Sequence, residues 1–334
     1  MSGRARERLD WQLGALALGF VALLAVPMVF SSFWISLLSS ILILVVFALS
    51  FNLLFGYTGL LSFGQAAFYG IGAYTVTLSL TGGVWFVPAF VAATLLAAVI
   101  GAISVQRGQL SFAMLTLGLS MLVYNLLFEF DDITGGANGL IVPNAEVNLF
   151  VVSFPIRTTV PFYYLALGTF VVVALVLYRI VNSPYGEILQ AIRENPERAE
   201  FNGIPVTYYQ WTVFVISGAV AGLAGGLIAP HIFIVSPNLT HWSMSAQPLL
   251  VTILGGPSYF LGPVVGALGF TAIEEWATSI TNYWQIVLGL VLIPIVLYFP
   301  NGLVGLLASA KERLENLTGP TTQSGSDESV EQED

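Results

Sequence analysis

Apolar stretches recur along the chain from Leu13 to Leu307, and short polar segments separate them. A helix needs about 20 apolar residues to cross the hydrocarbon core of a bilayer. The pattern therefore predicts an all-α polytopic integral membrane protein with about ten transmembrane helices, within a range of eight to ten. The predicted spans are 12–30, 34–55, 64–81, 84–105, 110–129, 161–181, 208–229, 240–256, 262–279 and 283–299.

The basic residues divide unevenly between the polar segments. If the N-terminus is cytoplasmic, nine of the ten basic residues lie inside and only Arg157 lies outside. Cytoplasmic loops carry an excess of Lys and Arg, so we predict that both termini are cytoplasmic. The predicted parts are a cytoplasmic N-terminus (1–11), a transmembrane domain (12–310) with an external loop (130–160) and a cytoplasmic loop (182–207), and a disordered acidic cytoplasmic tail (311–334).

Glycine and proline cluster in two apolar regions, residues 56–64 and 240–263. Such clusters favour broken or re-entrant backbone, which survives at membrane depth only where protein buries it or water reaches it. The two regions therefore point towards a translocation path. For any single glycine, close helix packing is the commoner explanation.

Several kinds of chemistry are excluded by residue type. The chain has no cysteine, and its sole lysine, Lys311, follows Ala310 rather than the glycine of a phosphate-binding loop. No His, Asp and Glu cluster with metal-ligand or catalytic spacing occurs in the predicted spans. We expect no enzyme activity, no bound cofactor or metal and no nucleic-acid partner, so energy for transport must come from a partner or an ion gradient.

A few ionisable residues lie near predicted span ends. Glu129, Glu274 and Glu275 are expected to reach water or lipid headgroups, because deep charges are costly. His231 and His241 flank an external segment and are expected to be surface loop histidines. The sequence assigns none of the five a role.

The most charged stretch before the tail is residues 182–206, between two apolar spans. Its apolar residues alternate with charges at helical spacing, which predicts a single short amphipathic helix ending near Gly203. A surface helix of this kind is suited to docking a partner.

Residues 52–74 (NLLFGYTGLLSFGQAAFYGIGAY) closely resemble the signature of branched-chain amino-acid ABC permeases. The segment from Ser183 to Gly203 looks like the cytoplasmic coupling loop of LivM-like subunits, although Arg198-Ala199-Glu200 departs from the general Glu-Ala-Ala order of ABC importers. Further pieces of the resemblance follow in the same order along the chain, at residues 134–140, 217–226, 254–267 and 299–303.

The resemblance implies a LivM-like permease subunit of an importer for branched-chain or related amino acids. It implies three kinds of partner besides the lipid bilayer: a homologous second permease, two cytoplasmic ATPase subunits that carry ATP and Mg²⁺, and an extracytoplasmic substrate-binding protein. It also implies that the coupling loop contacts the ATPases through Gly186, Glu187, Ile192, Arg193, Glu194, Asn195, Arg198, Ala199 and Gly203.

Polar residues near the two interrupted regions are the candidates for the substrate path. They are Tyr57, Thr58, Ser62 and Gln65 in the first half and Ser243, Ser245 and Gln247 in the second. The expected mechanism is alternating access, in which the coupling loop rocks the permease halves. Ser and Gln also serve as interhelical hydrogen-bond partners, so a structural role remains open for each.

Three other functions remain open. A stand-alone secondary transporter or channel for small neutral solutes would share the broken helices, and a urea- or amide-type ABC permease would share the motifs. A membrane-bound enzyme or receptor would need a site or signalling domain that the sequence lacks. The expected location is a prokaryotic plasma or inner membrane, and the excess of 19 carboxylates over 10 basic residues suggests a salt-loving source.

Overall fold

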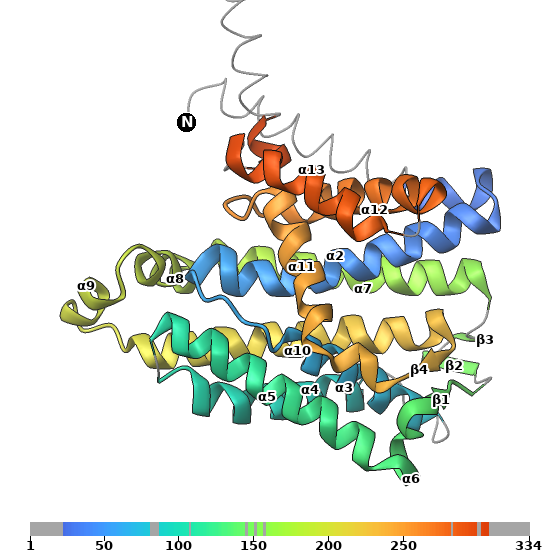
Figure 1. The fold of residues 1–334 in the computed structure, drawn as a ribbon, viewed down its shortest axis with the longest axis horizontal. Coiled ribbons are helices and arrows are strands. Elements are labelled where there is room, and N and C mark those ends of the chain that lie inside the picture. Colours follow the sequence, from blue (N-terminus) through green and yellow to red (C-terminus); the bar gives the residue numbers. More distant parts are fainter. Residues whose placement is uncertain are drawn as a thin grey trace, which may run out of the picture.

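The computed structural model describes residues 23–80, 87–106, 108–143, 146–149, 152–155, 158–281, 283–298 and 302–306. The predicted N-terminal segment 1–11, most of the first predicted span and the acidic tail 311–334 lie outside these residues. The described chain is almost entirely helical, which confirms the all-α membrane fold (Figure 1).

Nine apolar helices in the described part of the chain follow the predicted spans from 34 onwards. They are α2 (Ser32–Thr58), α3 (Gln65–Ser79), α4 (Val87–Ser104), α5 (Gln109–Glu129), α7 (Thr159–Val181), α10 (Val206–Ile232), α11 (Trp242–Gly255), α12 (Gly262–Ile280) and α13 (Trp284–Tyr298). Four of these, α2, α5, α7 and α10, are long and apolar enough to cross a membrane as continuous helices.

The two longest helices, α2 and α10, form the centre of the bundle. Of their most apolar stretches, 72% is buried, against 28% in α5 and 33% in α7. α10 packs on α2, α3 and α4, and α2 packs on α7, α11 and α12. The outward faces of α4 and α7 are wholly apolar in their middle turns, for example at Leu95, Val99, Val172 and Leu175, as expected for helices that face lipid.

Three of these helices are too short, over the residues that the structure describes, to cross a bilayer alone. α3 and α13 have 15 residues each and α11 has 14, about 21–23 Å at 1.5 Å per residue, against a hydrocarbon core of about 30 Å. The non-helical segment 59–64 precedes α3, and 256–261 follows α11. Both breaks fall inside the regions predicted to be interrupted, but Pro248 does not cause one, because it lies within α11.

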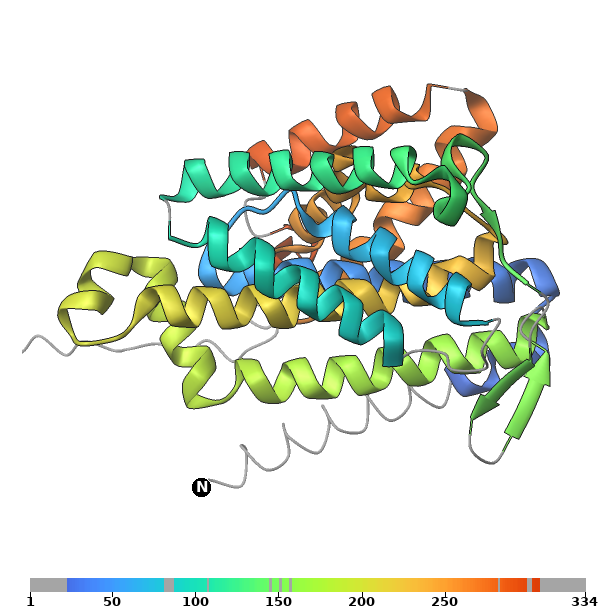
Figure 2. The same cartoon turned by 90° about the horizontal axis from the view of Figure 1, so that it is seen from below.

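Small elements gather at the two ends of the bundle (Figures 1 and 2). At one end lie α8 (Pro184–Glu194) and α9 (Pro196–Phe201). At the other lie α6 (Asp131–Thr134), η2 (Gly136–Asn138), β1 (Leu140–Ile141), β2 (Glu146–Leu149), β3 (Val152–Pro155), β4 (Ile234–Val235) and η3 (Pro237–Thr240). β1 pairs antiparallel with β4, and β2 with β3, so segments on either side of α10 are joined at this end.

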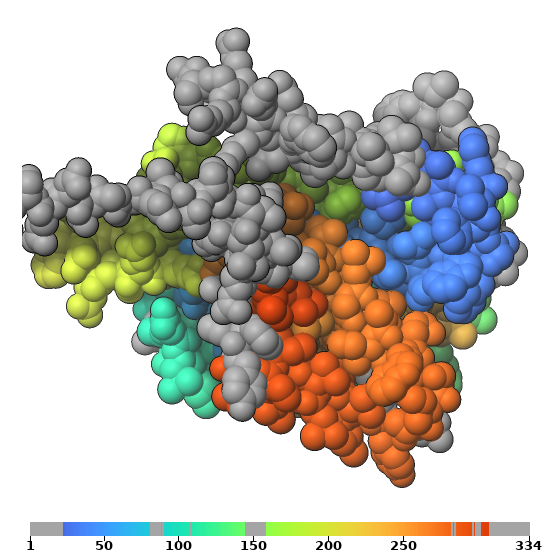
Figure 3. All heavy atoms as spheres, turned by 90° about the horizontal axis from the view of Figure 1, so that it is seen from above, coloured from blue at the N-terminus to red at the C-terminus, as the bar shows by residue number. Residues whose placement is uncertain are grey.

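α12 and α13 complete the bundle on the side of α2. Figure 3 shows their atoms, in orange to red, forming one surface beside the first turns of α2, in blue. α12 packs on α2, α11 and α13. The second half of the chain therefore covers the central helix that the first half supplies.

Candidate functional site

The first interruption, residues 59–64, is held in the bundle by side-chain hydrogen bonds. Ser245 of α11 donates its hydroxyl to the Phe63 carbonyl (2.8 Å) and accepts the Ala66 amide (2.9 Å). Thr116 of α5 accepts the Phe63 amide (3.2 Å), and Ser62 accepts the Gly64 amide (3.1 Å). These bonds satisfy backbone groups that a broken helix leaves without intrahelical partners.

A second series of hydrogen bonds starts at Gln65, the first residue of α3. The Gln65 side-chain amide donates to the Ser217 hydroxyl of α10 (3.0 Å), which donates to the Ser50 carbonyl of α2 (2.6 Å). Gln65 is fully buried, and its Oε1 has no hydrogen-bond partner among the described residues. The series thus ties α3 to both central helices.

The structure brings some of the predicted path residues together and separates others. Ser62, Gln65 and Ser245 are buried around the first interruption. Tyr57 and Thr58 are buried in the last turn of α2, where the Thr58 hydroxyl donates to the Leu54 carbonyl. Only two of the candidates are open at the surface of the single chain: Ser243 is exposed and Gln247 is partly buried on α11. A role for any of them in the path stays a prediction.

Sequence reasoning missed two residues of this cluster, Thr116 and Ser217. Each is a buried hydroxyl in a largely apolar helix. Their signal was weak, because hydroxyls in membrane helices often bond to their own preceding turn. Only the packing of α5 and α10 against α3 shows that these two face the break.

The second interruption, residues 256–261, is held by close backbone packing. A Cβ on Gly255 would lie 1.8 Å from the Gly262 carbonyl oxygen, and one on Gly262 would lie 2.1 Å from that of Gly256. A Cβ on Gly266 would lie 2.0 Å from the Val251 carbonyl oxygen. Glycine is therefore required where α11 and α12 meet, as in other close helix crossings in membranes.

The predicted amphipathic segment forms two helices rather than one. α8 ends at Glu194 and α9 begins at Pro196, with Asn195 between them in an extended conformation (φ −160°, ψ 100°). The residue before a proline is pushed out of the helical region, which explains the break. The Asn195 side chain then caps α9 by accepting the Arg198 amide (2.9 Å).

α8 packs on the bundle through three buried residues of the predicted coupling loop: Gly186, Leu189 and Ile192. A Cβ on Gly186 would lie 2.0 Å from the Val181 carbonyl oxygen, so α8 turns back closely on α7. The Tyr185 hydroxyl lies 2.7 Å from that of Thr212 in α10. Burial raises the pKa of the Tyr185 phenol, so it stays protonated and can hydrogen bond at neutral pH.

The other predicted coupling residues divide into packed and exposed positions. Ala199 is buried on the inner face of α9, whereas Glu187, Glu194 and Arg198 are exposed. Gly203 has φ +82°, a left-handed conformation that other residues rarely adopt. The Arg193 side chain reaches across to α2 and donates to the Gly56 carbonyl.

The expectation that both histidines are surface loop residues is wrong for His231. This residue lies in the last turn of α10, its Nε2 is 2.7 Å from the Ser40 hydroxyl, and its ring stacks on Phe162. Its imidazole therefore joins α10 to α2 and α7. His241 caps α11 by accepting the Ser243 amide (3.3 Å).

The carboxylates near the span ends are not gathered into a site. Glu129 and Glu275 are exposed, and Glu274 is partly buried on α12. Among the described residues, no three His, Asp or Glu side chains are grouped so that they could hold a metal ion. What the described residues bring together at the two interruptions is broken backbone and the hydrogen bonds that satisfy it.

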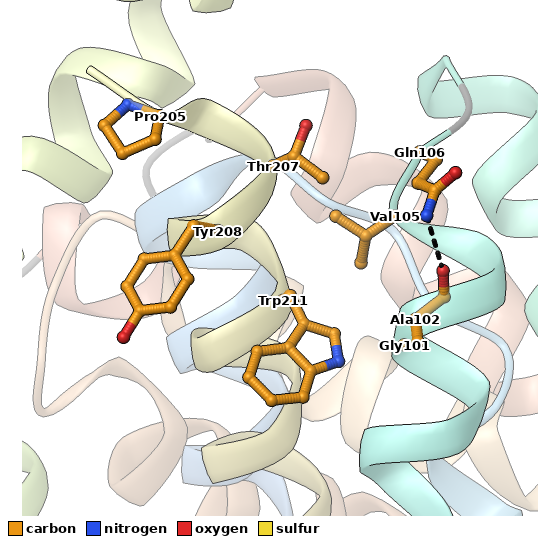
Figure 4. Close-up of a pocket in the computed structure, with 8 residues that line it drawn as sticks. All are labelled: Gly101, Ala102, Val105, Gln106, Pro205, Thr207, Tyr208 and Trp211. Carbon is orange, nitrogen blue, oxygen red and sulfur yellow. Dashed lines mark hydrogen bonds between the residues drawn. The ribbon is translucent and has the colours of Figure 1, made fainter.

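A pocket of about 440 Å³ lies between the end of α4 and the start of α10 (Figure 4). Trp211 and Tyr208 line one side, and Val105 and Gln106 line the other. The Trp211 indole nitrogen donates to the Ala98 carbonyl (3.0 Å), which fixes the ring between the two helices. Pro205 and Thr207, at the end of the predicted cytoplasmic loop, also line this pocket, but none of the predicted path residues or of the nine predicted ATPase contacts does.

Comparison with known proteins identifies the family. Residues 33–296 match the model of the branched-chain amino acid transport system permease component. The chain is 29% identical over 310 residues to the LivM permease protein of the high-affinity branched-chain amino acid transport system of Salmonella typhimurium, covering 85% of this chain and 73% of that protein.

Two other relatives extend the comparison. A probable branched-chain amino acid transport permease protein LivM of Methanocaldococcus jannaschii is 24% identical over 77% of this chain and 89% of its own length. The LivH permease protein of Escherichia coli is 22% identical over 77% of this chain and 90% of its own length. No solved structure matches. The chain therefore belongs to the family of branched-chain amino acid transport permeases and is a multi-pass membrane transport subunit.

Proposed function

We propose that this chain imports branched-chain or related small amino acids as one of two homologous permease subunits. Two cytoplasmic ATPases supply ATP hydrolysis with Mg²⁺, and an extracytoplasmic protein delivers the substrate. The proposed location is a prokaryotic plasma or inner membrane, and the acid excess of the chain suits a salt-loving source.

The observation that carries the proposal is the meeting of two broken segments inside the bundle. Ser245 of α11, the helix before the second interruption, bonds to Phe63 near the end of the first interruption and to Ala66 in the first turn of α3. Broken helices at membrane depth are typical of transporter substrate sites. A purely structural membrane protein would have less need for such segments, because each of their backbone N–H and C=O groups requires its own hydrogen-bond partner.

The two polar residues of α11 that reach the surface of the single chain are the strongest candidates for contact with substrate. Ser243 and Gln247 lie four residues apart, on one face of α11. Polar groups at membrane depth are costly against lipid, so this face should meet water or a second permease. The buried Ser62, Gln65 and Ser245 would then hold the backbone next to the path without contacting the substrate.

The mechanism we propose is alternating access. ATP binding draws the two ATPases together and moves α8 and α9, which are packed on the bundle through Leu189, Ile192 and Ala199. That motion rocks the permease halves, and hydrolysis resets the inward-facing state. The chain itself contributes position and shape rather than bond-breaking chemistry.

The deciding experiment is uptake of radiolabelled leucine by proteoliposomes that hold this chain, its partner permease, the ATPases and the binding protein. We expect uptake only with ATP and the binding protein together. Uptake driven by an ion gradient through this chain alone would instead establish a secondary transporter. ATP-dependent uptake of urea or amides but not of leucine would correct the substrate class.

A charge placed under α8 should separate transport from folding. Ile192 is 1% exposed, so Ile192→Asp buries a carboxylate against the bundle and should displace α8. We expect uptake to fall to background while membrane insertion, measured by protease protection, is retained. Gln190→Glu adds a charge at an exposed position of the same helix and is the matched control. Unchanged uptake in Ile192→Asp would contradict the role of α8.

A further inference from the structure

One cation connects α8 with the end of a central helix. Arg193 is exposed overall, yet its Nη1 donates to the Gly56 carbonyl in the last turn of α2. Its Cγ lies 3.4 Å from the position that a Cβ on Gly59 would occupy. The guanidinium and its apolar stem thus both contact the point where α2 stops.

The Gly56 carbonyl needs a partner from outside α2. In a continuing helix it would accept the amide of Leu60, but that amide bonds to the Leu54 carbonyl (3.3 Å) after Gly59 turns left-handed (φ 72°). The last carbonyls of a helix are left without intrahelical partners. Arg193 fills this place.

The charge of Arg193 also suits its position. The C-terminus of a helix carries partial negative charge, which a cation stabilises. The last turn of α2 holds no basic residue of its own. Arg193 therefore supplies from α8 the cation that α2 lacks, through a charge-assisted hydrogen bond.

The same turn also touches the second interruption. A Cβ on Gly56 would lie 2.5 Å from the Pro257 carbonyl oxygen, so no side chain separates α2 from segment 256–261. One turn earlier, the Asn52 amide donates to the Tyr259 carbonyl (3.4 Å). The last turn of α2 thus contacts both Arg193 and the second interruption, and it leads directly into the first.

We infer that Arg193 is the positioning residue through which α8 moves both interruptions. This inference rests on the proposed function and adds to it the contact that carries the motion. When the ATPases displace α8, Arg193 draws the end of α2 with it. Segments 59–64 and 256–261 follow because one is continuous with that turn and the other packs on it.

The test compares solute imported per ATP hydrolysed in proteoliposomes of the complete transporter. Arg193→Met keeps an apolar stem and removes the charge and its donors, whereas Arg193→Lys keeps a charge and a donor. Arg179→Met removes the same charge from an exposed position in the last turn of α7 and is the control.

We expect Arg193→Met to lower import per ATP by about tenfold, as expected for one charge-assisted hydrogen bond, while ATP hydrolysis continues. Arg193→Lys should recover part of the loss, and Arg179→Met should match the unmodified transporter. An unchanged ratio in Arg193→Met would overturn the inference. Absence of ATP-dependent uptake in the unmodified transporter would instead overturn the proposed function.

A labelling experiment checks the motion directly. The chain has no cysteine, so Ser258→Cys places a single thiol at an exposed position of the second interruption. We expect ATP to change its rate of reaction with a maleimide, and Arg193→Met to remove that change without loss of assembled transporter. An ATP response that persists in Arg193→Met would show that motion reaches the interruption by another contact.

Discussion

The two interruptions of the bundle bury broken backbone in different ways. Segment 59–64 is satisfied by hydroxyl groups from two helices, those of Ser245 in α11 and Thr116 in α5, and by the hydroxyl of its own Ser62. Segment 256–261 is flanked by glycines whose backbones touch, at Gly255, Gly262 and Gly266. The first relies on hydrogen bonds that can be exchanged, and the second on a contact that tolerates no added atom. We therefore expect the first to be the more adaptable of the two.

The largest effect should come from a methyl group in the glycine contact. Gly255→Ala would place its Cβ 1.8 Å from a backbone oxygen, which cannot move without shifting α12. Overpacking of this kind should cost about 3 kcal/mol or more and lower the thermal stability of the purified protein strongly. Gly289→Ala on α13 is the control, because its Cβ would meet nothing within 4 Å. Equal melting temperatures for the two variants would contradict the conclusion that the second interruption depends on a close glycine contact.

A smaller effect should follow from loss of the bridging hydroxyl. Ser245→Ala leaves the Phe63 carbonyl and the Ala66 amide without their partner, which should cost about 1–3 kcal/mol. Ser243→Ala, two residues away, removes a hydroxyl whose hydrogen bond to His241 Nδ1 (2.7 Å) is exposed to solvent, so it should change stability less. Thermal melts of both variants in the same detergent test this, and a larger loss in Ser243→Ala would contradict the assignment.

The smallest effect is expected at Gln65. Gln65→Met loses one hydrogen bond to Ser217 but also removes a buried oxygen that has no partner among the described residues. The two terms oppose each other, so stability should change by less than about 1 kcal/mol. If uptake nevertheless falls in a variant that melts normally, Gln65 acts in the path. If stability falls as far as in Ser245→Ala, the hydrogen bond to Ser217 is as important as the bridge.

The sequence predicted the positions of the helices well and their detailed breaks less well. Apolar runs and glycine clusters placed the spans and both interruptions, because the bilayer demands apolar length and because glycine permits irregular backbone. The prediction of a single helix over the coupling loop was wrong, because Pro196 forces Asn195 into an extended conformation. The proline is visible in the sequence, so this break was predictable. His231 was misplaced because α10 continues through Pro230 to Ile232.

Within the candidate site, the sequence indicated which polar residues matter but not which residues they bond to. Sequence selected Ser62, Gln65 and Ser245 as polar residues near breaks, and the structure places them together. It gave no means to select Thr116, and it marked Ser217 only as the start of a family motif, because their partners lie 53 and 152 residues away along the chain. Polar residues in membrane helices are few, so most can be named in advance, but their partners depend on which helices touch.

The sequence by itself determined the fold class, the family motifs, the order of the helices and the absence of cysteine, because apolar length, composition and motif order are properties of the chain alone. Only the tertiary structure decided that Ser245 links the first break to the start of α3, that Gly255 and Gly262 must lack side chains, and that Arg193 caps α2. The reason is physical: hydrogen bonds and close contacts depend on distances between helices, which no local pattern fixes.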